Sequence, residues 1–437
     1  MARNLRVGVQ RGLRQSIGGG LGTGDIFTLS PASFDFSRTK TSDSRITFTR
    51  ASSGTFVDAD GLIKSAATNT PRFDHDPVTG KSLGLLIEES STNRNTKSKT
   101  FSVWGVSSGF SLDYDAATAP DGTTSATALD RNGSGLARLE KNFSVGSGES
   151  TTFSVFAKSV NTTTGRYLRL AVNDAQTGER FADFDLVDGT VDVAASNGGN
   201  FTNAASRIEE YPNDWYRCSI SFSKTSSGSE NSICFHKLYI RQSNNSTDTP
   251  SGVTDVGMHV WGGQVERKTF PTSLIETDGS LVTRAADVVE ITGTNFSSFY
   301  SEAKGSVFVQ ASGATLTGNP LSLEIHDGTT NNRHTLDYGS GDITTVVGGA
   351  SQSALATGAP SSAEDVVKVA FAYEVNNFAA SKDGGSIVSD TSGTVPTTSE
   401  MQLGNDSAGT KPLNGHIKRL IYFPTRLADA TLQSITS

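Results

Sequence analysis

Residues 183–193 read Asp-Phe-Asp-Leu-Val-Asp-Gly-Thr-Val-Asp-Val and predict a β-hairpin. Asp188-Gly189 suits a two-residue turn, because both positions of such a turn adopt positive φ. The flanking stretches have the length and composition of strands. Similar short strands, separated by Gly, Asn and Ser, recur along most of the chain. This spacing predicts an all-β protein built from tandem β-sandwiches.

In the last third of the chain, short strand-like runs are separated by Gly, Asn and Ser, and this spacing predicts an all-β sandwich. The final dozen residues favour a short helix instead, with Asp429 as N-cap and with Leu432 and Ile435 on one face. The strands predicted in this third are 306–311, 321–326, 333–338, 366–375, 378–382, 401–403 and 416–423.

Turn-rich breaks divide the chain into five predicted parts. They are a basic, glycine-rich arm (1–24), a small β region (25–98), a β-sandwich (99–275), a linker (276–293) and a second β-sandwich with a short C-terminal helix (294–437).

Composition excludes several classes of protein. The chain has 437 residues, 35% of them hydrophobic, and a formal net charge of -8. We expect no membrane insertion, because no apolar run approaches the roughly 18–20 residues that a spanning helix needs. An acidic chain with interspersed charges also argues against nucleic acid as a partner. The two cysteines, Cys218 and Cys234, are placed on one predicted hairpin; two buried free thiols are favoured over a cross-strand disulfide.

The N-terminal arm differs from the rest in charge. It contains Arg3, Arg6, Arg11 and Arg14 and no acidic residue, so it carries +4 and the remainder carries -8 - 4 = -12. Its glycine run, 18–24, lacks the spacing of a phosphate-binding loop. We expect these arginines to dock the chain onto a larger assembly, with an arm folded back on its own domain as the alternative.

One long motif lies in the small β region. It consists of Arg-Ala-Ser-Ser-Gly-Thr-Phe-Val-Asp-Ala-Asp-Gly-Leu-Ile-Lys (50–64), Pro-Arg-Phe-Asp-His-Asp-Pro-Val-Thr-Gly (71–80) and Leu-Gly-Leu-Leu-Ile-Glu-Glu-Ser (83–90). It resembles a signature of bacteriophage and prophage virion proteins.

The two predicted sandwiches carry resemblances of their own. The segments Asn-Asp-Trp-Tyr-Arg-Cys (213–218), Trp-Gly-Gly-Gln-Val-Glu (261–266) and Phe-Pro-Thr-Ser-Leu-Ile (270–275) are similar to carbohydrate-binding jelly rolls. Residues 413–424, Leu-Asn-Gly-His-Ile-Lys-Arg-Leu-Ile-Tyr-Phe-Pro, resemble the closing strand of concanavalin-like and laminin-G-like sandwiches.

Together these resemblances imply a bacteriophage virion structural protein of the tail-fibre, tail-spike or head-fibre type. The implied partners are other virion proteins of the tail or capsid, further copies of the chain in a homotrimer, and bacterial surface glycan. The implied location is the virion, assembled in the host cytoplasm. No enzyme activity and no cofactor are expected.

Glycan contact would need an exposed aromatic ring and nearby polar groups. Trp104 lies in a Ser- and Gly-rich stretch and is the predicted exposed tryptophan, whereas Trp215 and Trp261 have the apolar neighbours of core residues. The turns at Asn331-Asn332-Arg333-His334 and Asn376-Asn377 are predicted to present polar groups at a rim.

Metal and catalytic motifs are weak. His75 stands between Asp74 and Asp76, where Asp side chains that cap a turn explain the pattern better than a metal site. Glu324 and His326 share a strand face, but the carboxylate spacing of concanavalin-like hydrolases is missing. Two alternatives stay open: a capsid- or tail-decorating adaptor with a purely structural role, and, with less support, a polysaccharide depolymerase.

Overall fold

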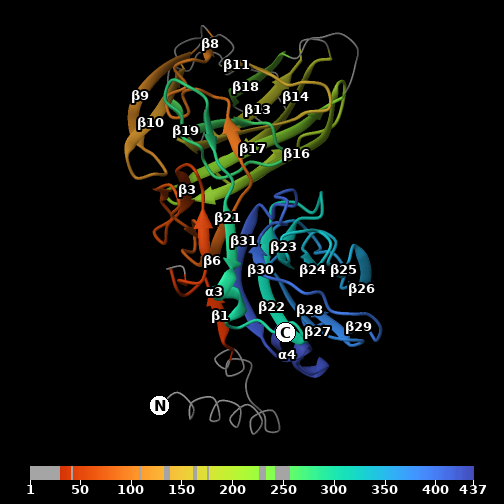
Figure 1. Cartoon of the computed structure of the whole chain (residues 1–437). Helices are drawn as coiled ribbons and strands as arrows, with labels where there is room; N and C mark the ends of the chain where they lie inside the picture. The colour runs from red at the N-terminus through yellow and green to blue at the C-terminus, as the bar shows by residue number, and fades with distance from the viewer. Residues whose placement is uncertain are drawn as a thin grey trace. The chain divides into compact units, whose positions relative to one another are not determined.

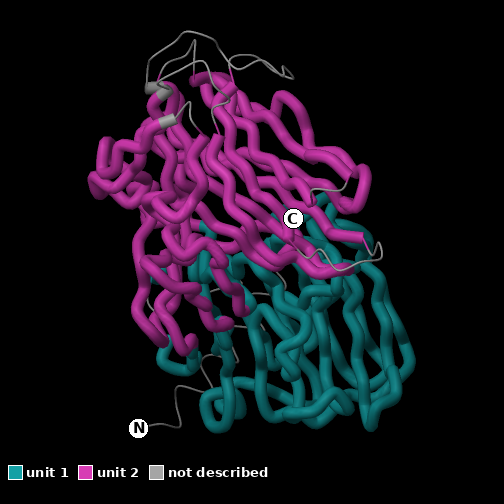
Figure 2. Tube along the Cα trace, turned by 90° about the horizontal axis from the view of Figure 1, so that it is seen from above, with its two compact units in different colours: residues 1–49, 83–89, 287–437 teal, residues 50–82, 90–286 magenta. Residues whose placement is uncertain are grey.

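The computed structural model describes residues 30–40, 43–107, 110–131, 138–160, 165–174, 177–225, 233–241 and 256–437 (Figure 1). The chain divides into two compact units (Figure 2). Unit 1 comprises 1–49, 83–89 and 287–437, and unit 2 comprises 50–82 and 90–286. No helix in the described ranges is long and apolar enough to cross a membrane.

Unit 1 contains two antiparallel sheets. The first has the order β29-β28-β27-β22-β31-β6, and β1 also pairs with β31. The second has the order β2-β21-β30-β23-β24-β25-β26. The strands of the first sheet are β1 (Ala32–Asp35), β6 (Ser82–Ile87), β22 (Lys304–Gly313), β27 (Val367–Glu374), β28 (Phe378–Lys382), β29 (Val388–Asp390) and β31 (Gly415–Phe423). Those of the second are β2 (Thr47–Thr49), β21 (Val288–Thr292), β23 (Leu321–His326), β24 (Arg333–Asp337), β25 (Asp342–Val347), β26 (Ala350–Ala356) and β30 (Glu400–Leu403).

Strand β31 (Gly415–Phe423) closes unit 1 by pairing with two strands from the first 90 residues, β1 and β6. Ala32 pairs with Tyr422, and Ile87 pairs with Gly415. At Gly84, with φ +104°, a Cβ would stand 2.4 Å from the carbonyl oxygen of Ile417. Only glycine fits so close an approach at that φ, so the Leu83-Gly84-Leu85 motif has a packing role.

The predicted C-terminal helix is confirmed as α4 (Asp429–Thr436), with Leu432 and Ile435 buried. The predicted cap was wrong by one position. Ala428 is the N-cap, and Asp429 lies in the first turn, where its negative charge suits the helix dipole. A second short helix, α3 (Gly293–Ser297), buries Phe296.

Unit 2 is a β-sandwich of two antiparallel sheets with the orders β16-β17-β12-β19-β10-β9 and β15-β14-β13-β18-β11-β8. The strands of the first are β9 (Phe110–Thr118), β10 (Thr124–Arg131), β12 (Ser150–Ser159), β16 (Phe201–Tyr211), β17 (Trp215–Lys224) and β19 (Val256–Glu266). Those of the second are β8 (Gly105–Val106), β11 (Arg138–Ser144), β13 (Tyr167–Asn173), β14 (Glu179–Asp185), β15 (Thr190–Val193) and β18 (Ile233–Arg241). Unit 2 also has the strand pairs β3 (Gly54–Val57) with β4 (Ile63–Ala66) and β7 (Ser91–Asn93) with β20 (Val282–Arg284), and the strand β5 (Arg72–His75).

The all-β fold class is therefore confirmed, and the hairpin predicted at residues 183–193 is β14–β15. Its predicted two-residue turn was wrong, because the loop spans residues 186–189 and only Gly189 of the Asp188-Gly189 pair has a positive φ, of +66°. The predicted small β region differs from the structure. Its strands β1, β2 and β6 belong to the sheets of unit 1, whereas β3, β4 and β7 lie in unit 2. Short strands of three to six residues bury little surface alone, so they pair with sheets whose other strands come from later in the chain.

The cysteines are both free and buried. Their placement on one hairpin was wrong, because Cys218 lies on β17 and Cys234 on β18, which belong to different sheets. Both side chains are part of the core between those sheets, together with Phe153, Leu170 and Leu238.

We expect both thiols to resist a thiol-specific reagent in the folded protein. Burial raises the pKa of Cys218 far above its usual value and that of Cys234 to about 11, and the thiolate is the reactive form. Labelling with Ellman's reagent should give no fast phase in buffer and two thiols in denaturant. A Ser102→Cys variant, with its thiol on the surface, is the positive control, and rapid native labelling of the unchanged chain would contradict this expectation.

Candidate functional site

The structure describes some of the predicted site residues and not others. The arginines of the predicted docking arm, Arg3, Arg6, Arg11 and Arg14, lie outside the described residues. The prediction that Trp104 is exposed was wrong. Its indole is 4% exposed, stacks on Phe153 at 5.3 Å between ring centroids, and donates from Nε1 to Asn95 at 3.2 Å. A ring in this position is a core residue and offers no face to a sugar. Trp215 and Trp261 are buried, as predicted.

The two asparagine turns lie in unit 1, between β23 and β24 and between β27 and β28. Most of their polar groups stabilise loops. Asn332 Oδ1 accepts from the N–H of Gly348 at 2.9 Å, and its Nδ2 donates to Asp327 at 2.8 Å. Asn376 Oδ1 accepts from the N–H of Gly393 at 3.0 Å. Asn331 is exposed and Asn377 is partly buried. Of the four asparagines, these two amides are therefore the better candidates for contact with a ligand.

His334 and Arg333 do not line a rim. His334 is fully buried, with its ring 4.6 Å from that of Tyr373. Arg333 donates from Nη1 to Glu324 at 2.9 Å, and the Glu324 carboxylate is itself fully buried. Along β24, Arg333 is partly exposed and His334 is buried, because consecutive side chains point to opposite faces of the sheet. Glu324, the candidate carboxylate of a hydrolase, is thus occupied by an internal ion pair.

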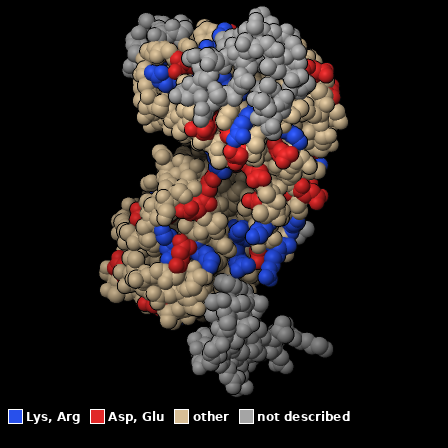
Figure 3. Space-filling model, turned by 180° about the vertical axis from the view of Figure 1, so that it is seen from behind, with Lys and Arg blue, Asp and Glu red and all other residues tan. Residues whose placement is uncertain are grey.

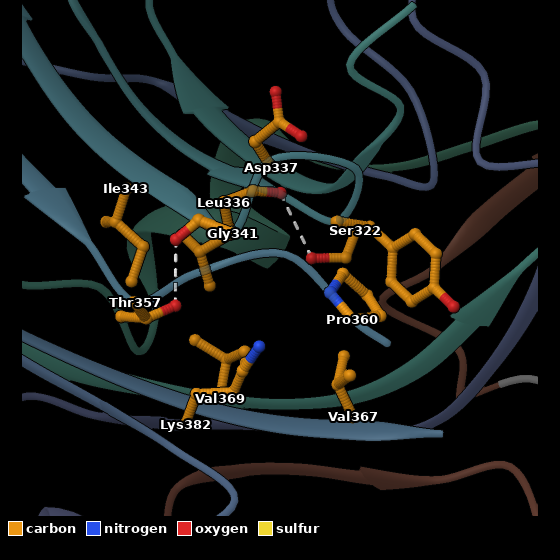
Figure 4. Close-up of a pocket in the computed structure, with 11 residues that line it drawn as sticks. Ser322, Leu336, Asp337, Gly341, Ile343, Thr357, Pro360, Val367, Val369 and Lys382 are labelled. Atoms are coloured by element: carbon orange, nitrogen blue, oxygen red, sulfur yellow. Dashed lines mark hydrogen bonds between the residues drawn. The ribbon is translucent and has the colours of Figure 1, made fainter. Parts of the chain in front are cut away.

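A small cavity between the sheets of unit 1 is too small for a sugar. Figure 4 shows Leu336 and Ile343 from β24–β25 on one side and Val367, Val369 and Lys382 from β27–β28 on the other. Its volume is about 10 Å³, the space of one water molecule at most. We therefore treat it as a packing gap.

Unit 2 has an open groove of about 470 Å³, which we call the lysine groove. Its volume is in the range of small-molecule sites. The lining side chains are all polar or charged: Lys97, Lys99, Thr100, Asp115, Ser125, Glu276, Thr277 and Asp278.

Two distant chain segments build the lysine groove. Residues 96–100 run beside 276–279, and Lys97 forms an isolated β-bridge with Asp278. Ser98 and Thr277 exchange hydrogen bonds, from Ser98 N to Thr277 Oγ1 at 3.0 Å and from Thr277 N to Ser98 Oγ at 2.9 Å. The alternation that buries Ser98 at 0% exposure places its neighbours Lys97 and Lys99 on the solvent side.

Ion pairs fix the charged groups of the lysine groove. Lys99 Nζ lies 3.2 Å from Asp121 and 3.1 Å from Glu276. Burial alone would lower the pKa of Lys99, but Glu276 and Asp121 outweigh it and raise that pKa. Lys97 pairs with Asp278 and lowers the pKa of the Asp278 carboxyl. The groove thus keeps ammonium donors and carboxylate acceptors side by side, and Figure 3 shows charges of both signs interspersed on one face of the molecule.

The buried ring of Trp261 contacts two residues that line the lysine groove, Lys99 and Ser125. Its ring is fully buried, lies 5.5 Å from Lys99 Nζ, and donates from Nε1 to Ser125 at 3.0 Å. It positions the polar groups without offering a stacking surface. This site was not predicted, because its two segments are far apart in the chain and residues 276–278 were assigned to a linker.

The structure gives the histidine and aspartate motifs structural roles. His75 is 3% exposed, and its Nδ1 lies 3.0 Å from the carbonyl oxygen of Val57. Asp76 accepts from the N–H of Thr79 at 2.7 Å, which is the predicted turn cap. Within the described ranges, no group of three or more His, Cys, Asp or Glu side chains could hold a metal ion.

The fold and the lysine groove together define a β-sandwich protein with an open, charged groove. No protein-family model matches the chain, and no curated protein matches it. Three of the similar solved structures are the CBM40 of an IT-sialidase from Ruminococcus gnavus (14% identity, TM-score 0.29, 33% of this chain and 88% of that chain), mouse laminin α1 domains LG4-5 (11%, 0.23, 75% and 92%) and Trypanosoma rangeli sialidase (10%, 0.27, 76% and 61%). At these scores the likeness does not assign the chain to a family.

Proposed function

We propose that the protein is a structural component of a bacteriophage virion, of the tail-fibre or tail-spike type, that contacts glycan on the host surface through its β-sandwiches. The virion assignment is supported by the resemblance of residues 50–90, and the glycan contact by the lysine groove. The open, polar lining of that groove is the observation that carries the proposal.

The chemistry of the lysine groove suits sugar hydroxyls. A hydroxyl both donates and accepts, so it pairs with a carboxylate and an ammonium at once. Glu276 and Asp278 supply acceptors, Lys97 and Lys99 supply donors, and Thr100, Ser125 and Thr277 supply hydroxyls. Hydrogen bonds to charged groups are roughly twice as strong as neutral ones, which offsets the missing aromatic platform.

The proposal is for binding without catalysis. Hydrolysis of a glycosidic bond needs one carboxylic acid and one carboxylate across the bond. In the lysine groove Glu276 and Asp278 are each paired with a lysine, and in unit 1 Glu324 is buried against Arg333. Lys97 also lowers the pKa of the Asp278 carboxyl, which favours its ionised form over a proton donor.

Assembly extends the proposal to the whole particle. Residues 1–24 would dock the chain onto other virion proteins, and a homotrimer assembled in the host cytoplasm would present three copies of the groove. Linked weak sites act at high effective concentration, so modest single-site affinity would suffice for adsorption.

Groove variants test the glycan contact. We expect Lys99→Met and Glu276→Gln each to weaken binding of the full-length chain to immobilised host surface polysaccharide by about tenfold, since each removes a charge-assisted hydrogen bond. Binding is measured by biolayer interferometry against a panel of purified capsular and O-antigen polysaccharides. The matched controls are Lys304→Met and Glu374→Gln, which break an exposed ion pair of unit 1 and should leave binding unchanged.

Other outcomes separate the alternatives. A chain that binds none of the host polysaccharides, yet is located on capsid or tail by immunogold electron microscopy, would be the decorating adaptor. Release of reducing ends from the polysaccharide would make it a depolymerase. Equal loss of binding in the groove variants and the unit 1 controls would remove the lysine groove from the proposal.

A further inference from the structure

Strand β9, at the edge of its sheet in unit 2, contains a bulge. It lies beside β10 (Figure 1), and the register pairs Ala117 with Ala126 and Asp113 with Ala128. Three residues of β9 therefore lie opposite a single residue of β10, where a regular antiparallel pair would have one opposite one. Bulges turn side chains into new directions, and they are frequent beside binding sites.

The bulge brings Asp115 to the lysine groove. Asp115 is the middle of the three bulged residues, has a φ of +57° and is one of the residues that line the groove. Asp tolerates a positive φ better than most residues with a side chain. Thr127, opposite the bulge, is buried and donates from Oγ1 to the carbonyl oxygen of Lys99 at 3.4 Å. The bulge is thus held next to the segment that carries Lys99.

Asp115 differs from the other carboxylates that line the lysine groove, because it has no ion pair. Asp278 pairs with Lys97. Glu276 pairs with Lys99 at 3.1 Å. Asp115 is exposed, and no ion pair or hydrogen bond engages its carboxylate within the part of the chain that the structure describes. This carboxylate is therefore open to a ligand in the groove.

The charge balance of the lysine groove favours a cation. The lining contains three carboxylates and two ammonium groups: Asp115, Glu276, Asp278, Lys97 and Lys99. Two further groups lie just outside the lining. Asp121 contacts Lys99 at 3.2 Å, and Lys64 Nζ is 3.5 Å from the carbonyl oxygen of Asp121. Four carboxylates then stand against three ammonium groups, and an excess of negative charge in a groove attracts a positively charged ligand.

We infer that the lysine groove binds an amino sugar, with the Asp115 carboxylate accepting a hydrogen bond from the protonated amine. The inference rests on the proposed glycan contact and specifies its ligand as a hexosamine without an acetyl group on the nitrogen. An ammonium group has three donors and forms charge-assisted hydrogen bonds with a carboxylate. Binding involves no covalent step. Ethanolamine carries the same ammonium group without a sugar ring, and the experiment distinguishes the two.

Isothermal titration of the full-length chain with glucosamine and with glucose tests the inference. The two sugars differ only at C2, where an amine that is protonated at pH 6 replaces a hydroxyl. We expect glucosamine to bind about threefold more tightly at low ionic strength, the size of effect that an exposed ion pair provides. N-acetylglucosamine, which keeps the nitrogen but not the charge, should lack this preference. The preference should shrink in high salt and disappear at pH 9, where the amine is neutral.

Variants of Asp115 assign the preference to this carboxylate. In Asp115→Asn the Kd for glucosamine should rise to that for glucose, and Asn tolerates the positive φ of the bulge. Asp115→Gly is the second variant, because glycine adopts this φ without strain, and it should lose the preference as well. Asp113→Asn is the matched control. It removes an exposed carboxylate on the same strand, outside the groove lining, and should keep the preference.

Four results would overturn the inference: no binding of glucosamine, equal Kd values for glucosamine and glucose, a preference that both Asp115 variants retain, or equal affinity for ethanolamine, which would make the site one for ammonium ions in general. These failures are distinguishable from failure of the proposed function. Lys99→Met should keep the preference while it weakens polysaccharide binding, because Asp115 is unchanged. Polysaccharide binding that depends on Lys99, without any preference for glucosamine, would leave the proposed function standing and remove the role of Asp115.

Discussion

Replacing Trp261 by Ala is expected to lower the free energy of unfolding of unit 2 by about 3–5 kcal/mol, the usual cost of truncating a large buried aromatic side chain. The ring is fully buried and packs edge-on against Phe156 at 5.5 Å. The cost combines lost apolar burial with the cavity that rigid sheets cannot close. Urea unfolding followed by fluorescence or circular dichroism measures it.

The same substitution links stability to the lysine groove. Trp261 supports Lys99 and holds Ser125 through its Nε1. We therefore expect polysaccharide binding to weaken in Trp261→Ala even under conditions where the variant stays folded. Tyr114→Ala, which truncates an aromatic ring that is 42% exposed on β9, is the control and should cost well under 1 kcal/mol. A similar loss in both variants would contradict the burial of Trp261.

The second large effect is a loss of stability in acid. His236 and His334 are fully buried, and burial lowers the pKa of each to about 3 from 6.5. Nε2 of His236 lies 2.9 Å from the hydroxyl of Thr151. Nδ1 of His334 lies 2.9 Å from the hydroxyl of Thr345. Among the residues that the structure describes, no carboxylate is hydrogen-bonded to either ring to stabilise a positive charge.

The direction of the pH dependence follows from proton uptake. Between pH 6.5 and about 3 the unfolded chain binds a proton at each of these histidines and the folded chain does not. Stability from this source is complete above pH 6.5 and falls as pH decreases, by up to about 1 kcal/mol per pH unit for each histidine. Urea midpoints at pH 7, 6, 5 and 4 measure the slope.

Substituting the two histidines distinguishes their contribution to the pH dependence of stability from that of the carboxylates, which also titrate in acid. The His236→Gln, His334→Gln double variant should be less stable at pH 7 and should lose less stability between pH 7 and pH 4. His416→Gln, at a partly buried histidine of β31, is the control. An acid slope that the double variant shares with the unchanged chain would contradict the role of these two histidines.

Local sequence patterns predicted much of the fold. Strands β23 and β28 begin and end at the predicted residues, because alternation and flanking turns mark their ends. Strands β25 and β26 were missed. Their sequences are rich in Ser, Thr and Ala, and each has a single large buried apolar residue, Ile343 in β25 and Leu355 in β26, which is too weak a pattern to mark a strand.

The candidate sites were less accessible to prediction. Trp104 lies outside regular strand signals, yet long-range contacts with Phe143 and Phe153 bury it. The lysine groove joins residues about 180 positions apart. A pattern within one segment carries no information about such pairings, since they are set by tertiary contacts.

Strand β31 has a consequence for biosynthesis. It leaves the ribosome after its partners β1 and β6 and after the whole of unit 2, so unit 2 is encoded as an insertion within unit 1. Loop closure over so many residues is slow compared with local pairing, and domains tend to fold in the order of synthesis. Unit 2 can complete its sheets while unit 1 still waits for its C-terminal strand. A nascent chain stalled before residue 415 would therefore carry a folded insert within an unfinished host, with its early strands available to chaperones or to a neighbouring copy.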